Sequence, residues 1–379
     1  MAYLDHNATS PLCAEARVAV ERALAIGGNA SSVHAKGRAA RALIEKARAQ
    51  VATLAGAAPG DVVFTSGATE ANATALWGAV QGAADAGARI TRLFVSAIEH
   101  GSVLANATAL TERFAGLRLE LLPVTSDGVA DLDALRSELR EGKGRALVAL
   151  MAANNETGAA QPVEEARELA VEAGALLLVD AVQVAGKIAV PRADYVSLSA
   201  HKIGGPQGAG ALILRKDVPF APLYLGGEQE QGRRAGTENL AAIAGFGAAA
   251  EAVRPEVPAS ARLRDLFEAR LKRTDPSSVI FGGKAERLPN TSNFALPGIA
   301  AETSLIALDL DGVMMSSGAA CSSGKVKPSH VLAAMGISND LARCALRASF
   351  GRDSTEADVD AAIGSITNLL ARVRSRAAA

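Results

Sequence analysis

The segment Ser-Ala-His-Lys-Ile-Gly-Gly-Pro-Gln-Gly at 199–208 places three polar side chains, Ser199, His201 and Lys202, directly before a glycine-rich turn. A lysine held among apolar neighbours loses solvation, which lowers its pKa and frees its amine as a nucleophile. The glycines allow the chain to approach a ligand closely. The alternative is a solvated loop lysine. On the first interpretation, Lys202 can form a Schiff base with a carbonyl compound.

A second reactive group follows the apolar run at 176–179, where Asp180 is succeeded three residues later by Gln183. An ionised carboxylate at the end of an apolar strand needs a compensating cation or a protonated ring nitrogen. A pyridinium nitrogen would satisfy Asp180 well. A helix-capping aspartate explains the same residue equally well.

Small residues in Ser-Gly-Ala-Thr-Glu-Ala-Asn at 66–72 follow an expected strand and open an expected helix. The backbone N–H groups there, including that of Ala68, and the Thr69 hydroxyl are free to hold a phosphate. An ordinary helix cap is the alternative. Neither G-x-x-x-x-G-K-[ST] nor a G-x-G-x-x-G that opens a helix after a strand occurs, so the best-attested nucleotide motifs are missing.

Two more strand ends carry polar residues. His100 could lie over a flat aromatic cofactor or move protons, although a lone histidine is more often structural. Asn154 begins Asn-Asn-Glu-Thr-Gly and supplies amide donors, although these residues also suit a plain turn. Because each segment alone has a structural explanation, the prediction of a cofactor site depends on their coming together.

The elements that must position these residues alternate in type along the chain. Short apolar runs rich in Val, Leu and Ile alternate with Ala-rich amphipathic stretches, as in strands buried between helices. The pattern predicts an α/β layered domain over residues 15–255, with ligands at the carboxyl ends of its strands. The expected strands are 61–65, 92–97, 146–151, 175–180, 195–199 and 209–214.

A Pro-containing stretch at 254–258 marks the expected end of this domain. Beyond it the sequence predicts a helix at 263–271, strands at 291–294 and 313–316, and a final helix at 355–372. We therefore expect a smaller domain made of residues 1–14 and 256–379.

Composition narrows the class of protein. The chain has 379 residues, is 49% hydrophobic and carries a formal net charge of -1. Without runs of Lys and Arg, and with 3% aromatic residues, no nucleic-acid or anionic membrane partner is expected. The longest apolar stretch, 240–250, is shorter than the ~20 residues that span a bilayer, so no transmembrane helix is expected.

The three cysteines, Cys13, Cys321 and Cys344, are too few and scattered for a disulfide framework or a zinc cluster, which favours a reducing cytoplasm. Cys321 lies in a stretch dense in Ser and Gly at 316–328, which predicts a flexible loop able to deliver a thiolate. An inert surface cysteine is the alternative. Cys13 and Cys344 are expected to be structural.

Nearly the whole chain resembles the pyridoxal-phosphate enzymes of the class V aminotransferase type, and specifically the NifS/IscS-like cysteine desulfurases. The motifs that carry the resemblance are Leu-Asp-His-Asn-Ala-Thr at 4–9, Gly-Asn-Ala-Ser-Ser-Val-His at 28–34, Ala-His-Lys at 200–202, Gly-Gly-Glu-Gln-Glu at 226–230, Gly-Arg-Arg-Ala-Gly-Thr-Glu-Asn at 232–239, Ser-Ser-Gly-Ala-Ala-Cys-Ser-Ser at 316–323 and Leu-Arg-Ala-Ser-Phe-Gly-Arg at 346–352. The resemblance implies pyridoxal-phosphate fold type I, with a mostly parallel central sheet between helices and a smaller α+β lobe.

By position, the resemblance also implies a role for each site residue. It implies that Lys202 is the Schiff-base lysine, that His100 stacks on the cofactor ring and that Asp180 pairs with the pyridine nitrogen. It implies that Gln183 and Asn154 contact ring substituents. The residues that it implies for the phosphate site are Ala68, Thr69, Ser199 and His201. Thr237 joins the phosphate site from the neighbouring subunit of a homodimer, and Arg347 grips the substrate carboxylate as a guanidinium fork.

The implied activity removes sulfur from L-cysteine to give L-alanine and a persulfide on Cys321, with Lys202 taking the Cα proton. An iron–sulfur scaffold protein is the implied sulfur acceptor, and Cys321 would meet metal only through the cluster shared with that scaffold. Two other readings stay open: an aminotransferase or selenocysteine lyase of the same fold, in which Cys321 is dispensable, and a non-catalytic sulfur or metal carrier that uses Cys321 as a ligand.

Overall fold

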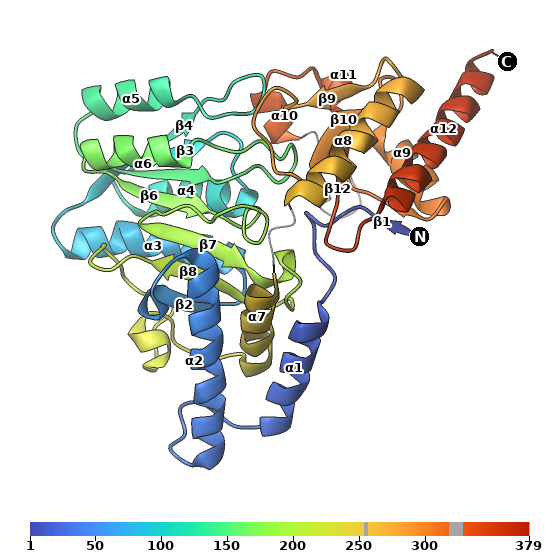
Figure 1. Cartoon of the computed structure of the whole chain (residues 1–379). Helices are drawn as coiled ribbons and strands as arrows, with labels where there is room; N and C mark the ends of the chain where they lie inside the picture. The colour runs from blue at the N-terminus through green and yellow to red at the C-terminus, as the bar shows by residue number, and fades with distance from the viewer. Residues whose placement is uncertain (254–256, 318–328, 379) are drawn as a thin grey trace.

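The computed structural model describes residues 1–253, 257–317 and 329–378, so Cys321 lies outside the described residues. Its largest sheet has seven strands in the order β2-β8-β7-β6-β5-β3-β4 (Figure 1). These strands are β2 (Val62–Thr65), β3 (Ile90–Ser96), β4 (Arg118–Leu122), β5 (Arg145–Met151), β6 (Leu176–Asp180), β7 (Tyr195–Ser199) and β8 (Gly210–Leu214). The pairs β7–β6, β6–β5, β5–β3 and β3–β4 are parallel, whereas β8 runs antiparallel to both of its neighbours.

Helices cover both faces of this sheet, because alternate residues of each buried strand point to opposite sides. In β5, Val148 and Leu150 pack with α2, α5, α6 and α7, whereas Leu147 and Ala149 pack with α3 and α4. The helices are α1 (Ala14–Ile26), α2 (Ala35–Ala55), α3 (Ala68–Asp85), α4 (Gly101–Arg113), α5 (Leu132–Glu141), α6 (Val163–Glu172) and α7 (Leu240–Ala252). The predicted α/β class with a mostly parallel sheet is confirmed.

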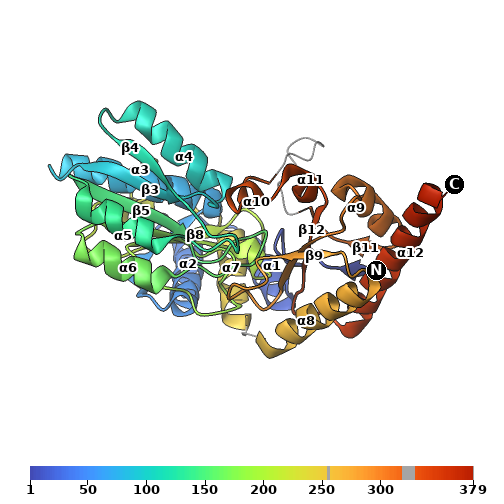
Figure 2. The same ribbon diagram turned by 90° about the horizontal axis from the view of Figure 1, so that it is seen from above.

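A second lobe lies beside the domain that contains this sheet, and both chain ends are in this second lobe (Figure 2). Its strands form an antiparallel sheet in the order β12-β10-β9 and a parallel pair of β1 with β11. The strands are β1 (Ala2–Tyr3), β9 (Val279–Phe281), β10 (Thr291–Ala295), β11 (Val313–Met314) and β12 (Ala345–Ser349). The helices are α8 (Val257–Thr274), α9 (Ala301–Leu310), α10 (His330–Ala334), α11 (Asn339–Ala342) and α12 (Glu356–Ala378).

Most expected strands agree with the structure to within two residues, and the strand at 195–199 has the same bounds as β7. The sequence pattern did not predict β4, which is an edge strand of alternating charged and apolar residues in which only Leu122 is buried. The strand expected at 313–316 ends at Met314, although Ser316 still forms an isolated bridge with Arg347. The division into domains 15–255 and 1–14 with 256–379 stays a prediction.

In the part of the chain that the structure describes, no helix is long and apolar enough to cross a membrane. In that same part, no three residues among His, Cys, Asp and Glu gather as they would around a metal ion.

A buried ion pair fixes the chain between β8 and α7. Arg48 of α2 donates through Nη1 and Nη2 to the Glu230 carboxylate at 2.6 and 2.9 Å, and the side chains are only 6% and 2% exposed. Glu230 Oε2 also accepts from the backbone N–H of Phe64 at 2.9 Å, which ties this segment to β2. Glu230 has a φ of 50°, so these contacts hold a residue in a left-handed conformation.

We expect Glu230→Ala to lower the free energy of unfolding by about 3–5 kcal/mol, because it removes the buried counter-ion of Arg48 and leaves that guanidinium with only the exposed Glu45 as an ion-pair partner among the described residues. Chemical denaturation followed by circular dichroism measures the change. The matched control is Glu165→Ala, which removes an exposed pair with Arg136 and should cost less than about 1 kcal/mol. Equal losses in the two variants would show that the buried pair has no special weight.

Candidate active site

Lys202 lies where the large sheet meets the N-terminal segment. It ends the short helix η2 (Ala200–Lys202), which follows β7 directly. Its Nζ donates to the carbonyl oxygens of Asn7 at 2.6 Å and Ala8 at 2.9 Å. Burial, and next the positive charge of Arg347, lower the pKa of Lys202 to about 8. A larger fraction of this amine than of an ordinary lysine is therefore uncharged near neutral pH and able to act as a nucleophile.

Asp180 is the last residue of β6, one strand along, and is 7% exposed. Asn72 of α3 donates to its Oδ2 at 2.8 Å, and the backbone N–H of Val182 donates to its Oδ1 at 3.0 Å. The negative charge of Asp180 acts to raise the pKa of both Lys202 and His100, so the three groups share one site. The carboxylate is thus fixed by two donors and free to receive a cationic ring nitrogen.

His100 follows β3 and caps α4. Its Nδ1 accepts from the backbone N–H of Ser102 at 3.1 Å and lies 2.8 Å from the Ser102 hydroxyl. Desolvation by the surrounding protein, and then the Lys202 charge, lower the pKa of His100, while Asp180 opposes this change. His100 is exposed, so its imidazole is available to lie against a flat ligand.

The expected phosphate site is at the start of α3, which begins at Ala68 after Gly67. Thr69 is exposed in the first turn, and the segment lies against the start of β8: a Cβ at Gly210 would come within 2.6 Å of Gly67 Cα. His201 Nδ1 lies 3.1 Å from Thr9 Oγ1. Burial, and then the charge of Lys202, lower the pKa of His201 to about 4. Ser199 is buried at the end of β7.

Arg347, in β12 of the second lobe, also reaches this site. Its Nη2 pairs with Asp5 Oδ1 at 2.7 Å and its Nη1 donates to the carbonyl oxygen of Asn155 at 2.9 Å. Arg347 Nε is buried and has no hydrogen-bond partner among the described residues. A buried guanidinium with an unpaired N–H is suited to receive a carboxylate.

The side chain of Asn154 forms hydrogen bonds within its own turn. Its Oδ1 accepts from the backbone N–H groups of Glu156 and Thr157 at 2.9 and 3.0 Å, and its Nδ2 donates to the Ile98 carbonyl at 3.1 Å. Asn154 is fully buried. The turn that the sequence offered as an alternative is therefore present, and contact of Asn154 with a cofactor ring stays a prediction.

The most connected residue of the site, Asn7, was missed by sequence reasoning. Its carbonyl oxygen accepts from Lys202 and, at 3.0 Å, from Gln183 Nε2. Its side-chain oxygen accepts from Lys187 Nζ at 3.1 Å, and its Nδ2 donates to Thr291 Oγ1 at 2.8 Å. Asn7 therefore joins the strand ends of the large sheet to β10 of the second lobe. Its only signal in the sequence was its place in the motif at 4–9.

Lys187 is a second reactive amine that sequence reasoning missed. Besides Asn7, its Nζ donates to Gln183 Oε1 at 3.1 Å. Burial, and then the charges of Lys202 and Arg347, lower the pKa of Lys187 to about 7. No sequence pattern marked it, because a Gly-Lys pair seven residues after Asp180 looks like an ordinary loop.

The residues on either side of 318–328 are fastened to the site. Before this range, Ser316 and Arg347 exchange backbone hydrogen bonds of 3.2 and 2.6 Å. After it, the Ser329 hydroxyl donates to Glu156 Oε2 at 2.5 Å and accepts from the backbone N–H of Leu332, which caps α10. Burial raises the pKa of Glu156. Both attachments are to the site itself, because Arg347 and the turn containing Glu156 form part of it.

Together these residues fit pyridoxal phosphate. An activated amine, a fixed carboxylate and an open imidazole come from the ends of β7, β6 and β3, and free helix N–H groups follow β2. The buried Asn72 Oδ1, beside Asp180, has no partner among the described residues and is a further polar contact available to a ligand. Thr237 is exposed between β8 and α7, and its contribution to a neighbouring subunit stays a prediction.

Comparison with known proteins agrees with this site. The family Aminotransferase class-V matches residues 2–362. A protein named cysteine desulfurase from Cereibacter sphaeroides is 44% identical over 94% of this chain and 92% of its own length. An IscS-like cysteine desulfurase from Mycobacterium tuberculosis is 39% identical over 100% of this chain and 98% of its own.

Solved structures show the same relationship. The crystal structure of a NifS-like protein from Rickettsia africae has a TM-score of 0.87 and 32% identity, and the match covers 98% of this chain and 99% of that one. This likeness confirms the predicted fold type I. The two relatives, matched over 92% and 98% of their own length, are both named as cysteine desulfurases, and the chain belongs to the class-V aminotransferase family.

Proposed function

We propose that this enzyme is a pyridoxal-phosphate-dependent cysteine desulfurase that converts L-cysteine and the Cys321 thiol into L-alanine and a Cys321 persulfide. The observation that carries the proposal is the activated amine of Lys202, which shares one buried site with Asp180 and Arg347. Full-length similarity to cysteine desulfurases selects this reaction among those that the fold supports.

Each residue has a role that follows from its contacts. Arg347 binds the substrate carboxylate through its unpaired N–H and thereby orients the Cα–H bond. Lys202 would hold the cofactor, and as a base with a lowered pKa it would remove the Cα proton of the substrate. Asp180 would keep a ring nitrogen of the cofactor protonated, and His100 would pack on the ring. When bound, pyridoxal phosphate supplies the electron sink for the carbanion.

Cys321 is the proposed sulfur acceptor within the enzyme. Its thiolate would take the substrate sulfur, so the Cβ–S bond breaks as the S–S bond of the persulfide forms, and alanine leaves after protonation. Support comes from the attachments at Ser316 and Ser329, which tie both neighbours of 318–328 to the site. An iron–sulfur scaffold in the cytoplasm is the proposed final acceptor, and a homodimer with Thr237 completing the partner's phosphate site is the proposed assembly.

We expect Cys321→Ala to lower the rate of alanine formation from L-cysteine by at least about 100-fold, because no thiol is left to take the sulfur. The variant should keep the visible absorbance of the bound cofactor. Alanine is quantified by amino-acid analysis and persulfide by mass spectrometry.

The matched control is Cys344→Ala, which removes a buried thiol outside the site and should keep most of the activity. Undiminished alanine and sulfide formation by Cys321→Ala would instead favour a lyase or aminotransferase. Purified wild-type protein without cofactor absorbance would favour a sulfur carrier.

The lowered pKa of Lys202 predicts how the apoprotein reloads its cofactor. Because only the uncharged amine attacks the aldehyde, the loading rate should rise with pH and level off above about 8, rather than near the usual lysine value of about 10.5. Stopped-flow absorbance of apoprotein mixed with pyridoxal phosphate measures the profile.

In Arg347→Met the profile should move to higher pH, since the charge that lowers the pKa of Lys202 is gone. Arg343→Met removes an exposed guanidinium from the same lobe and should leave the profile in place. A wild-type rate that still climbs steeply near pH 10 contradicts an activated Lys202.

A further inference from the structure

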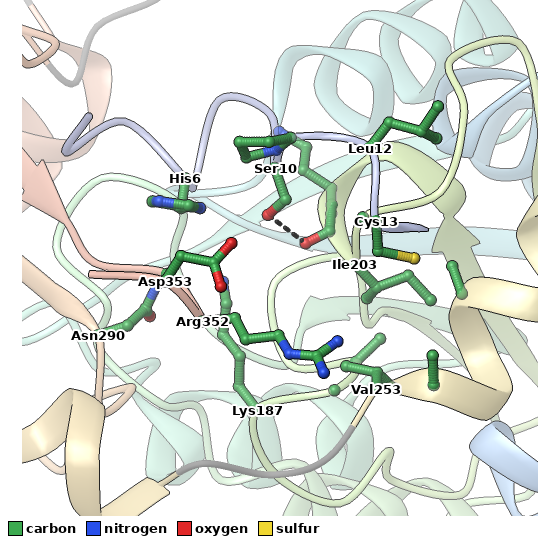
Figure 3. A pocket seen from close by; sticks show the side chains of 18 of the residues that line it. His6, Ser10, Leu12, Cys13, Lys187, Ile203, Val253, Asn290, Arg352 and Asp353 are labelled. Carbon is green, nitrogen blue, oxygen red and sulfur yellow. Dashed lines mark hydrogen bonds between the residues drawn. The ribbon is translucent and has the colours of Figure 1, made fainter. Parts of the chain in front are cut away.

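A cavity of about 390 Å³ lies against the N-terminal segment, and neither His100 nor Asp180 is among its lining residues. Figure 3 shows side chains from both lobes around it, Lys187, Cys13 and Arg352 among them. The Ser10 hydroxyl donates to the Lys202 carbonyl oxygen at 3.0 Å and closes one wall. The volume is within the range of about 300–1,000 Å³ typical of small-molecule sites.

One part of the lining is positively charged. Lys187 donates only to amide oxygens, and among the described residues no carboxylate forms an ion pair with it. Arg352 is exposed at the rim, and the described part of the chain gives it no ion pair either. A buried ammonium without a counter-ion costs free energy that an anion in the cavity would offset.

The rest of the lining is apolar. Leu12, Ile203 and Val253 form what we call the apolar wall, which faces the cavity from three different segments (Figure 3). Glu15 and Asp353 are also at the cavity, so its net charge suits a singly rather than a doubly charged anion. The positive charge and the apolar wall of the cavity together suit a ligand that has one carboxylate attached to a small hydrocarbon body.

We propose that this cavity binds a small organic monocarboxylate, whose carboxylate pairs with Lys187 and whose hydrocarbon body packs on the apolar wall. The site is distinct from that of the amino-acid substrate, because neither Arg347 nor Asp180 lines it. Lys202 is one of the residues that line the cavity.

The cavity is linked to the active site through shared hydrogen bonds. Lys187 bonds to the side chain of Asn7, whose carbonyl oxygen accepts from Lys202. A carboxylate beside Lys187 compensates the positive charge that acts on Lys202, so the two sites are coupled whether or not the substrate is cysteine.

The test is calorimetric titration of the cofactor-loaded wild-type enzyme with isovalerate, its neutral amide isovaleramide and inorganic phosphate. Isovalerate should bind with one-to-one stoichiometry, and isovaleramide and phosphate should each bind at least about tenfold more weakly. Saturable isovalerate binding that is no tighter than that of the amide would overturn the proposal, as would no binding at millimolar concentration.

Two variants locate the site. Ala252→Leu fills the cavity from the end of α7 and should abolish isovalerate binding, whereas Arg352→Gln should weaken it several-fold. Arg140→Gln, an exposed arginine at the end of α5, is the matched control and should bind as wild type. If Ala252→Leu does not fold, as judged by cofactor absorbance and Tm, the Arg352 and amide comparisons decide; unchanged binding in Arg352→Gln and Ala252→Leu would place the ligand elsewhere.

The affinity should also depend on pH. Lys187 faces the positive charges of Lys202 and Arg347, while the neighbouring His6 has its pKa lowered to about 4 by burial and is neutral. Because the anion pairs with charged Lys187, isovalerate binding should weaken as pH rises above about 7. An affinity that does not change between pH 6 and pH 8.5 would show that Lys187 is not the counter-ion.

Discussion

The hydrogen bonds of Asn7 are the interaction on which the rest of the site depends. A single asparagine, 1% exposed, accepts from Lys202, Gln183 and Lys187 and donates to residues of the second lobe. Its backbone N–H is bonded to Ser349 at 2.9 Å. Because a buried polar group is costly unless it is paired, these bonds fix the distance between the lobes and hold the amines at the strand ends.

Crowded cations explain the chemistry that this arrangement allows. Burial first, and then the charge of Arg347, lower the pKa of Lys202, while Asp180 and Asp5 oppose this change. Burial, and then the charges of Lys202 and Arg347, lower the pKa of Lys187. A guanidinium does not lose its proton in proteins, so the crowding of cations acts on the two lysines. The same excess of positive charge that activates Lys202 also attracts a substrate carboxylate at one side of Asn7 and, as we propose, a second anion at the other.

The fold and the strand-end residues could be predicted from sequence because they obey local rules. Apolar runs predict β5, β6 and β7; Asp180 ends β6, and Lys202 lies three residues after the end of β7. Asn7 and Lys187 could not be found this way, because their importance comes from contacts between segments about 180 residues apart. For Asn154 the structure contains the turn that the sequence offered as the alternative, and its contact with a cofactor stays a prediction. Strand β4 was not predicted because an exposed edge strand lacks an apolar run.

The central claim is that Lys202, and not the second buried amine Lys187, holds the cofactor. Both amines have lowered pKa values, so reactivity alone does not separate them. Position does, because the Asp180 carboxylate acts on the pKa of Lys202 but not on that of Lys187. Borohydride reduction of the cofactor-loaded enzyme followed by peptide mass spectrometry tests this directly. The account predicts a pyridoxyl adduct on Lys202 alone. An adduct on Lys187, or an unmodified Lys202, would contradict it.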